Sequence, residues 1–413
     1  MEPSGATDRF SVYLLVVSRI LRSFAAGLIN LVFPFLVLNQ LRAGSFILGL
    51  AYVAAMIATA VIGFFVGFAT DSSRRATFIF AFILLPASTL LLVFSTNLAV
   101  VFLAATVGGY SATGSLAAGG IGGYVQPIQS AVTADVTSRS DRTYYFGLLS
   151  FISGISSAAG SLVAGFPTIN EALIIATITA AASVIPGFFI KMRNVSRDRK
   201  TVLARETKEE NQKHKTLGLK SAGVIGKFGV TGMINGLSNG LIVPFLIPFF
   251  ILVYGVSRSE MGIYTTISGL VGSFALLLAS RLETRLGFLK GLIATRGSTV
   301  IIAILFPIIR LLPVSLFLYF AFPALRIVAM PVVQTAMTDM VDRDELGRAF
   351  GINQGMRLTT GAAGTAFSGY EFDASAFELP FVVYAVVMVA NLYLYVRFFS
   401  NYKSPVERRD SNG

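Results

Sequence analysis

The chain has 413 residues, of which 54% are hydrophobic and 13% are charged, and its formal net charge is +12. A soluble protein of this length would carry roughly a quarter charged residues, so the composition excludes an ordinary soluble domain. The absence of cysteine excludes disulfides and thiol chemistry. The basic charge does not indicate nucleic-acid binding, because ten of the basic residues lie together between Lys191 and Lys220.

Apolar runs of eighteen or more residues recur along the chain, and each is long enough for a membrane-spanning helix. Allowing about 20 residues per span, we expect an all-α polytopic membrane protein with twelve helices. Their predicted limits are 11–40, 44–70, 75–95, 98–136, 143–168, 170–190, 222–254, 258–281, 288–309, 314–341, 347–370 and 377–399. The predicted regions are a six-helix bundle 1–190, a basic linker 191–221, a second six-helix bundle 222–400 and a tail 401–413.

The charge of the loops predicts the orientation of the chain in the membrane. The loops after the even-numbered helices, together with both tails, hold most of the basic residues, including Arg74, Arg75 and the ten of the linker. Basic loops are retained in the cytoplasm, so we expect both termini to be cytoplasmic. We also expect the protein to be a monomer that crosses the cell membrane many times.

The two predicted bundles show an internal repeat. Asp135 matches Asp339 at a distance of 204 positions, and "GSLVAG" matches "GTAFSG" at the same offset. Asp71 falls opposite Glu283, which is 212 positions away. The change of offset predicts eight extra residues in the first half, in the Gly/Ala/Ser-rich stretch 108–123. The two halves are therefore predicted to be parallel repeats.

The stretch "GFATDSSRRATF" after the second helix carries the most specific motif. Twelve helices, a six-plus-six repeat and a long basic central loop resemble the major facilitator superfamily, whose motif at this place is G-x-x-x-D-(R/K)-x-G-(R/K)-(R/K). Gly67, Asp71, Arg74 and Arg75 stand in register with it, whereas Ser72 replaces the first basic residue and Arg74 stands where the family usually has glycine. The resemblance implies the twelve-helix fold of that family and transport of a small solute.

The resemblance also implies a role for this charged cluster in gating, since in the family it caps helix ends and ties one half to the other. "SRLETRLG" looks like its second-half copy, and "TADVTSRSDR" and "TDMVDRDE" place further charges at repeat-equivalent positions, which suits gating better than catalysis. The alternative is a simple stop-transfer group of charges. The predicted gating residues are Gly67, Asp71, Arg74, Arg75, Asp135, Arg142, Glu283, Arg285 and Asp339.

Two further features bear on the branch of the family. "GSLVAG" keeps Gly160 and Gly165 of a stretch that antiporters of the superfamily carry, but it lacks the proline, and plain helix packing is the alternative. The drug-efflux branch usually has an arginine in the fourth helix. Here Gly122 stands at the position that matches Arg326 of the second half, which argues against proton coupling by the usual arrangement.

Charged residues within the spans mark candidate binding positions, because a charge at the bilayer centre costs about 2.5 kcal/mol or more. Arg22, Arg326 and Arg357 are such residues, whereas no Asp or Glu lies in the middle of a predicted span. Unpaired arginines favour an anionic solute. The alternatives are that they bond to backbone carbonyls or that Arg22 reaches the interface, as we expect for Arg19 and Lys227.

Amides extend this polar set on predicted helices 1, 4, 7, 10 and 11, the first four of which line the central cavity in the family. Asn30 and Asn239 occupy similar places in "GLINLVFPFL" and "GLSNGLIVPFL". The predicted solute-binding residues are Arg22, Asn30, Gln126, Gln129, Asn235, Asn239, Arg326, Gln334, Asn353 and Arg357.

The sequence thus favours a secondary transporter that moves a small organic solute, anionic or amphiphilic, by alternating access, with export or antiport ahead of uptake. Proton-coupled efflux of lipophilic cations and nutrient symport are the alternatives, and a membrane enzyme, receptor or scaffold is a weaker rival. The chain has no GxxxxGK(S/T) motif and no metal-spaced His/Cys cluster, so we expect no cofactor, metal or catalytic residue. The expected partners are the solute, a coupling ion and the lipid bilayer.

Overall fold

The computed structural model describes residues 7–70, 73–95, 97–111, 121–138, 141–192, 221–342 and 345–402, without the side chains of 68, 142–143, 278–285 and 347–348. The elements of the first half are α1 (Arg9–Phe35) with the π-helical turn η1 (Leu36–Gln40), α2 (Ser45–Thr70), α3 (Arg74–Phe94), α4 (Leu98–Gly108), η3 (Gly123–Val125), α5 (Gln126–Val136), α6 (Arg142–Ala164), α7 (Ile169–Ala182) and α8 (Pro186–Phe189). Those of the second half are α10 (Ala222–Ile242), η5 (Val243–Phe245), α11 (Leu246–Tyr254), α12 (Arg258–Ile308), α13 (Leu312–Met340), α14 (Leu346–Asp373) and α15 (Leu379–Phe399).

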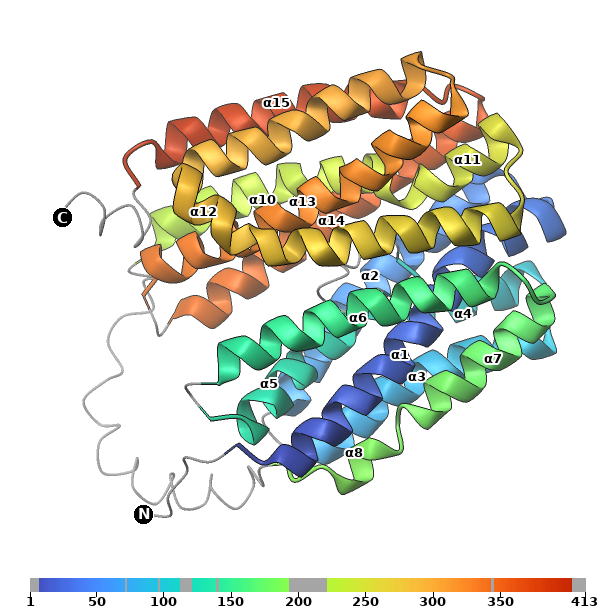
Figure 1. The fold of residues 1–413 in the computed structure, drawn as a ribbon, viewed down its shortest axis with the longest axis horizontal. Coiled ribbons are helices and arrows are strands. Elements are labelled where there is room, and N and C mark those ends of the chain that lie inside the picture. Colours follow the sequence, from blue (N-terminus) through green and yellow to red (C-terminus); the bar gives the residue numbers. More distant parts are fainter. Residues whose placement is uncertain are drawn as a thin grey trace.

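The described part of the chain confirms the all-α membrane fold. Ten of its helical segments are long and apolar enough to cross a bilayer. The broken helix α4–α5 and the more polar α14, which is 28 residues long, complete the twelve spans. The element α12 contains two of them, because Gly287 adopts φ 72° and ψ 179° and turns the helix back on itself. Figure 1 shows this reversal at one end of the molecule.

Local sequence signals explain where several helices begin. The carboxylate of Asp8 accepts a hydrogen bond from the backbone N–H of Ser11 and so caps α1. Thr168 with Glu171 forms a capping box at the start of α7. In each case a side chain satisfies backbone donors that the first turn of a helix leaves free.

The fourth predicted helix is broken, so the expectation of one helix over 98–136 is wrong. α4 ends at Gly108, and Gly109 and Gly122 both adopt left-handed conformations, with φ values of 60° and 76°. The N–H of Gly122 donates to the carbonyl of Gly109 at 3.0 Å, so the chain leaves the helix and re-enters it at nearly one point. The matching helix of the second half, α13, is continuous, which agrees with extra residues in 108–123.

The two halves form two helical bundles that lie side by side, blue to green and yellow to red in Figure 1. We call the end where α1 begins and α15 ends the terminal end, and the opposite end, where α6 ends and α12 begins, the distal end. α2 packs against α14, and α6 packs against α12, across the bundle boundary. Toward the terminal end the helices of the two bundles diverge (Figure 1).

Contacts between the bundles can be followed inward from the distal end. The hydroxyl of Ser259 donates to the carbonyl of Gly165 at 2.8 Å, and Thr266 donates to Ala158 at 2.9 Å, one step deeper. The rings of Phe151 on α6 and Phe274 on α12 lie 5.6 Å apart at their centroids. α6 and α12 therefore run antiparallel along one side of the boundary.

Candidate functional site

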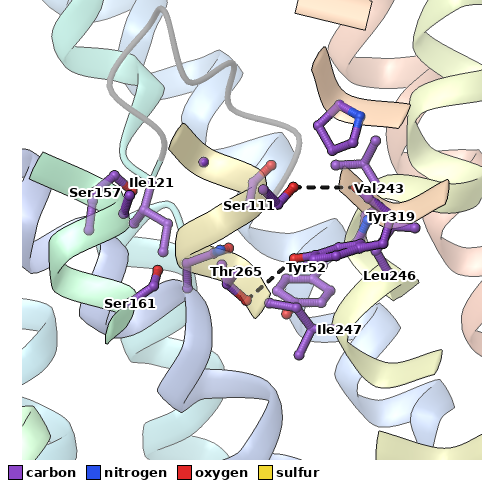
Figure 2. A pocket seen from close by; sticks show the side chains of 17 residues that line it. Tyr52, Ser111, Ile121, Ser157, Ser161, Val243, Leu246, Ile247, Thr265 and Tyr319 are labelled. Atoms are coloured by element: carbon purple, nitrogen blue, oxygen red, sulfur yellow. Dashed lines mark hydrogen bonds between the residues drawn. The ribbon is translucent and has the colours of Figure 1, made fainter. Parts of the chain in front are cut away.

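A cavity of about 130 Å³ lies between the two bundles, and both contribute to its walls. The first bundle supplies residues of α1, α2 and α6, and the second supplies η5, α11, α12 and α13. Figure 2 shows side chains from the two sides meeting across it. The described lining residues are Ala26, Asn30, Tyr52, Ser111, Ile121, Ser157, Ala158, Ser161, Val243, Pro244, Leu246, Ile247, Thr265, Ser268, Gly269, Tyr319 and Pro323.

Hydroxyl groups and apolar side chains give this cavity its chemical character. The hydroxyl of Tyr319 donates to Thr265 at 3.3 Å, and Ser268 donates to the backbone carbonyl of Tyr319 at 3.3 Å. On the opposite wall Ser161 donates to the carbonyl of Gly27 at 3.1 Å. None of the described lining residues is charged. The cavity suits the uncharged body of a small solute, held by apolar contact and a few hydroxyls.

Of the ten predicted solute-binding residues, Asn30 is the one among the lining residues. Asn239 occupies the similar place on α10, where it is buried, and its Oδ1 has no hydrogen-bond partner. Asn235 is half-buried one turn away, and Asn353 donates to the carbonyl of Phe228 at 2.6 Å. Gln126 on α5 and Gln334 on α13 are both exposed.

Arg22 is buried in the first bundle and is bound to the break in the fourth span. Its two terminal nitrogens each donate at 3.1 Å, one to the carbonyl of Ile121 and one to that of Gly122. Its guanidinium also lies 5.4 Å from the ring centre of Phe82. This arrangement corresponds to the alternative in which a membrane arginine bonds to backbone carbonyls, because the broken helix leaves those carbonyls free.

Arg19, one turn before Arg22 on α1, is also buried, so the expectation of an interfacial position is wrong for this residue. Its guanidinium donates to Gln129 on α5 and to Ser153 on α6. Lys227 is exposed and lies 6.0 Å from the ring centre of Phe398. The prediction for Arg19 considered only its place along α1. It could not include the neighbouring helices, which bury the side chain.

Arg326 and Arg357 lie in the second bundle, together with Arg296, which the sequence analysis did not single out. Arg296 on α12 is only 6% exposed, and its guanidinium lies 4.9 Å from the ring centre of Tyr395. Arg326 interacts electrostatically with Arg296 and with Arg357. Arg296 falls in the middle of the predicted helix 288–309, so the rule that selected the other arginines could have found it.

Three of the predicted gating residues, Arg74, Arg75 and Asp135, form contacts between helices. Arg74, the first residue of α3, forms an ion pair with Asp135 on α5 and donates to the carbonyl of Ala131 at 3.3 Å. Arg75 donates to the carbonyl of Ile190 at 3.2 Å. These contacts join helices within the first bundle.

Two other predicted gating residues lie near the ends of their helices. Gly67 is half-buried near the end of α2, and Asp339 is exposed near the end of α13. The remaining members lie outside the described part, either as whole residues or as side chains: Asp71, Arg142, Glu283 and Arg285.

Two helical bundles, twelve spans and a cavity walled by both bundles define a polytopic membrane protein of the transporter type. The family model of the Major Facilitator Superfamily matches residues 15–325 and 228–413. The chain therefore belongs to the Major Facilitator Superfamily, a family of transporters rather than enzymes. The search of the curated proteins gave no match.

Solved structures with the same fold include several transporters. The human organic anion transporter MFSD10 (TETRAN) is 14% identical, with 94% of this chain and 99% of that chain covered and a TM-score of 0.67. The nucleoside transporter NupG is 13% identical, with 94% and 100% covered and a TM-score of 0.71. The xylose transporter XylE from E. coli, in an inward open conformation, is 12% identical, with 97% and 98% covered and a TM-score of 0.70.

Proposed function

We propose that this protein is a secondary active transporter that moves a small organic solute across the membrane by alternating access. The observation that carries the proposal is the cavity between the bundles, whose walls come from both of them. A solute held there contacts two bodies that can rock against each other, which is how transporters of this architecture expose a site to one side at a time.

The contacts between the bundles support a particular state. They run inward from the distal end, where the guanidinium of Arg258 donates to the carbonyl of Pro167. With both termini in the cytoplasm, as the basic loops predict, this state is closed toward the outside and faces inward. The outward-facing state then requires the α6–α12 and α2–α14 contacts to separate.

The charges of the second bundle favour an anionic or amphiphilic solute. Arg326 and Arg357 lie in membrane spans, and the sequence has no acidic residue between 284 and 338 or between 346 and 370. A positive site of this kind prefers carboxylate or phosphate groups. The fold is shared with a human organic anion transporter, which agrees with this preference. Export or exchange is our first choice, and efflux of lipophilic cations or nutrient symport is the second.

The substrate class is tested by a stability screen of the purified protein, because a ligand that binds the folded state raises its melting temperature. Organic and phosphorylated anions are compared with lipophilic cations, and Arg326→Ala and Arg357→Ala serve as variants. We expect anions to stabilise the wild type and not the variants. Stabilisation by lipophilic cations alone, unchanged in the variants, would contradict an anionic solute. Active compounds are then followed as fluxes in proteoliposomes.

Alternating access is tested with a disulfide, since the chain has no cysteine of its own. A Cβ placed on Gly154 would lie 3.1 Å from the Cβ of Ser273 in the other bundle, so a small outward shift reaches the separation of about 3.5–4.5 Å found in disulfides. We expect Gly154→Cys with Ser273→Cys to cross-link readily on oxidation, to stop transport, and to recover on reduction. Each single cysteine variant is the control. Undiminished transport by the cross-linked protein would contradict the mechanism.

A further inference from the structure

Three membrane arginines of the second bundle come from three different helices, Arg296 from α12, Arg326 from α13 and Arg357 from α14. Arg296 is buried, and the other two are half-buried. Arg326 is the middle member, because it interacts electrostatically with both of the others. Three like charges in a region of low dielectric constant repel one another, so a stable arrangement requires a negative partner.

The structure supplies no such partner among the described residues around this group. The Nη1 atoms of Arg296 and Arg326 are both buried without a hydrogen-bond partner. Arg357 donates to Gln354, a neutral amide on its own helix, at 2.7 Å. Leaving a buried charged donor unsatisfied costs more than losing an ordinary hydrogen bond. The unsatisfied donors therefore indicate a site that a ligand completes.

The membrane arginines of the first bundle have more hydrogen-bond acceptors from the protein. Arg22 donates both terminal nitrogens to backbone carbonyls, and Arg19 donates to Gln129 and Ser153. Each of those two guanidinium groups thus donates to two acceptors of the protein, although Nε of Arg22 is buried without one. The two bundles differ at the terminal nitrogens: both of Arg22 have backbone acceptors, whereas Nη1 of Arg296 and Nη1 of Arg326 have none.

Aromatic rings lie close to two of the three arginines. The guanidinium of Arg296 lies over Tyr395, and that of Arg326 lies 5.5 Å from the ring centre of Phe322. A cation over the face of an aromatic ring is attracted by the ring electrons. This attraction supplies no oxygen acceptor in place of a carboxylate, and a tetrahedral or planar oxyanion accepts paired hydrogen bonds from guanidinium groups.

We propose that Arg296, Arg326 and Arg357 together bind an oxyanion group, a carboxylate, sulfate or phosphate, with Arg296 as a binding residue of the site. This deepens the proposed function, on which it rests, by placing the charged end of the solute in the second bundle. Tyr384 belongs to the same group of residues, because it interacts electrostatically with Arg326 and Arg296. Its hydroxyl donates a hydrogen bond to Thr299 at 2.8 Å.

Arg326 lies close enough to the cavity for one solute to contact both the cavity and the three arginines. Tyr319 and Pro323 line the cavity, and Arg326 follows them on the same face of α13 by the spacing of i, i+4 and i+7. Along the axis of α13, the backbone of Arg326 lies roughly one helical turn, about 5 Å, beyond Pro323. An amphiphilic anion would place its body among the apolar and hydroxyl groups of the cavity and its oxyanion at the arginines.

The test is equilibrium binding of radiolabelled sulfate to the purified full-length protein, at constant ionic strength, with chloride, inorganic phosphate and phenyl phosphate as competitors. Arg296→Gln and Arg326→Gln remove one fork each, and Arg397→Gln, an exposed arginine on α15, is the matched control. We expect saturable sulfate binding that weakens about tenfold or more in the first two variants. The control should bind as the wild type does.

Two further measurements keep the result interpretable if Arg296→Gln does not fold. Arg296→Lys retains the charge but loses the fork, so we expect binding between that of the wild type and that of Arg326→Gln. Phenyl phosphate should compete more strongly than inorganic phosphate if the oxyanion belongs to a solute whose body fills the cavity, and equally if the site holds a free inorganic anion.

The proposal is overturned if sulfate does not bind, if it binds equally well to Arg326→Gln, or if chloride competes as strongly as phosphate does. This outcome is distinct from a failure of the proposed function. Fluxes without anion binding would leave a transporter whose arginines only brace helices. Anion binding without any flux would leave an oxyanion site in a protein that does not transport.

Discussion

The carboxylate of Asp373 accepts a hydrogen bond from the backbone N–H of Phe46 at 3.4 Å, and the two residues belong to different bundles. Phe46 lies in the first turn of α2, and Asp373 is the last residue of α14. The residue before α2 is Gly44, which has no side chain to cap the helix. A negative charge supplied from the other bundle therefore stabilises the start of α2 at the distal end.

This contact predicts that Asp373 favours the state in which the distal end is closed. We expect Asp373→Ala to weaken that closure by roughly 0.5–2 kcal/mol, the usual contribution of a helix cap. The measurement is the rate at which Gly154→Cys and Ser273→Cys cross-link at the α6–α12 contact, which closes together with the α2–α14 contact, and this rate should fall several-fold. Glu371→Ala, two residues earlier on α14, is the control. An unchanged rate would show that the distal end closes without this cap.

Gly160 on α6 lies against the backbone of α1, where a Cβ would overlap the carbonyl oxygen of Phe24. We expect Gly160→Ala to force the two helices apart at a cost of about 1–3 kcal/mol. Gly147, on the same helix, has open space around it. There an alanine should stabilise the helix slightly, by up to about 1 kcal/mol. Thermal unfolding of the two variants in one detergent measures the difference, and equal melting temperatures would contradict close packing at Gly160.

The ion pair of Arg74 with Asp135 joins α3 to α5, and the two side chains are only 16% and 10% exposed. We expect Asp135→Asn to destabilise the protein by about 1–3 kcal/mol, because it leaves a mostly buried guanidinium without its charged acceptor. Exchange of the two residues, Arg74→Asp with Asp135→Arg, should recover part of the loss. Both results are read from thermal unfolding.

The same pair distinguishes a structural role from a gating role. Since both residues belong to the first bundle, we expect Asp135→Asn to leave the rate of cross-linking between Gly154→Cys and Ser273→Cys unchanged. A large change in that cross-linking rate would instead show that the cluster controls the balance of states, as the family resemblance implies.

The sequence was sufficient for the fold because hydrophobic length and internal repetition are properties of the chain itself. The extra residues of the fourth span were also visible, since the offset between repeats changes from 212 at Asp71 to 204 at Asp135, although one continuous helix was expected there. The form of the interruption was not visible. It depends on left-handed conformations at Gly109 and Gly122, and glycines of that stretch look alike in sequence.

The candidate site was harder to predict, because its residues are recognised by their neighbours rather than by their type. Tyr319 and Thr265 line the cavity, yet a tyrosine or threonine at helical spacing is equally typical of a core. Arg22 and Arg326 look equivalent in sequence, and only the structure shows carbonyl acceptors at both terminal nitrogens of Arg22 and none at Nη1 of Arg326. Charge could be read from the sequence, but hydrogen-bond satisfaction could not.

The break in the fourth span leads to a last prediction, at Gly122. This residue adopts φ 76° and ψ 44°, and a Cβ on it would overlap Nη2 of Arg22. We expect Gly122→Ala to destabilise the protein by about 1–2 kcal/mol from the left-handed backbone alone, and by more if Arg22 is displaced. Gly123 is the matched control, because a Cβ there would lie at an ordinary distance of 3.6 Å from Thr59.

A double-mutant cycle separates the two causes of this effect. If the alanine acts by displacing the guanidinium, the cost of Gly122→Ala combined with Arg22→Gln should be smaller than the sum of the single costs, by about 0.5–3 kcal/mol. If only the backbone matters, the two costs should add. Thermal unfolding of the four proteins provides the comparison, and a Gly122→Ala variant as stable as Gly123→Ala would contradict both causes, because neither a left-handed backbone nor a blocked Arg22 would then constrain this position.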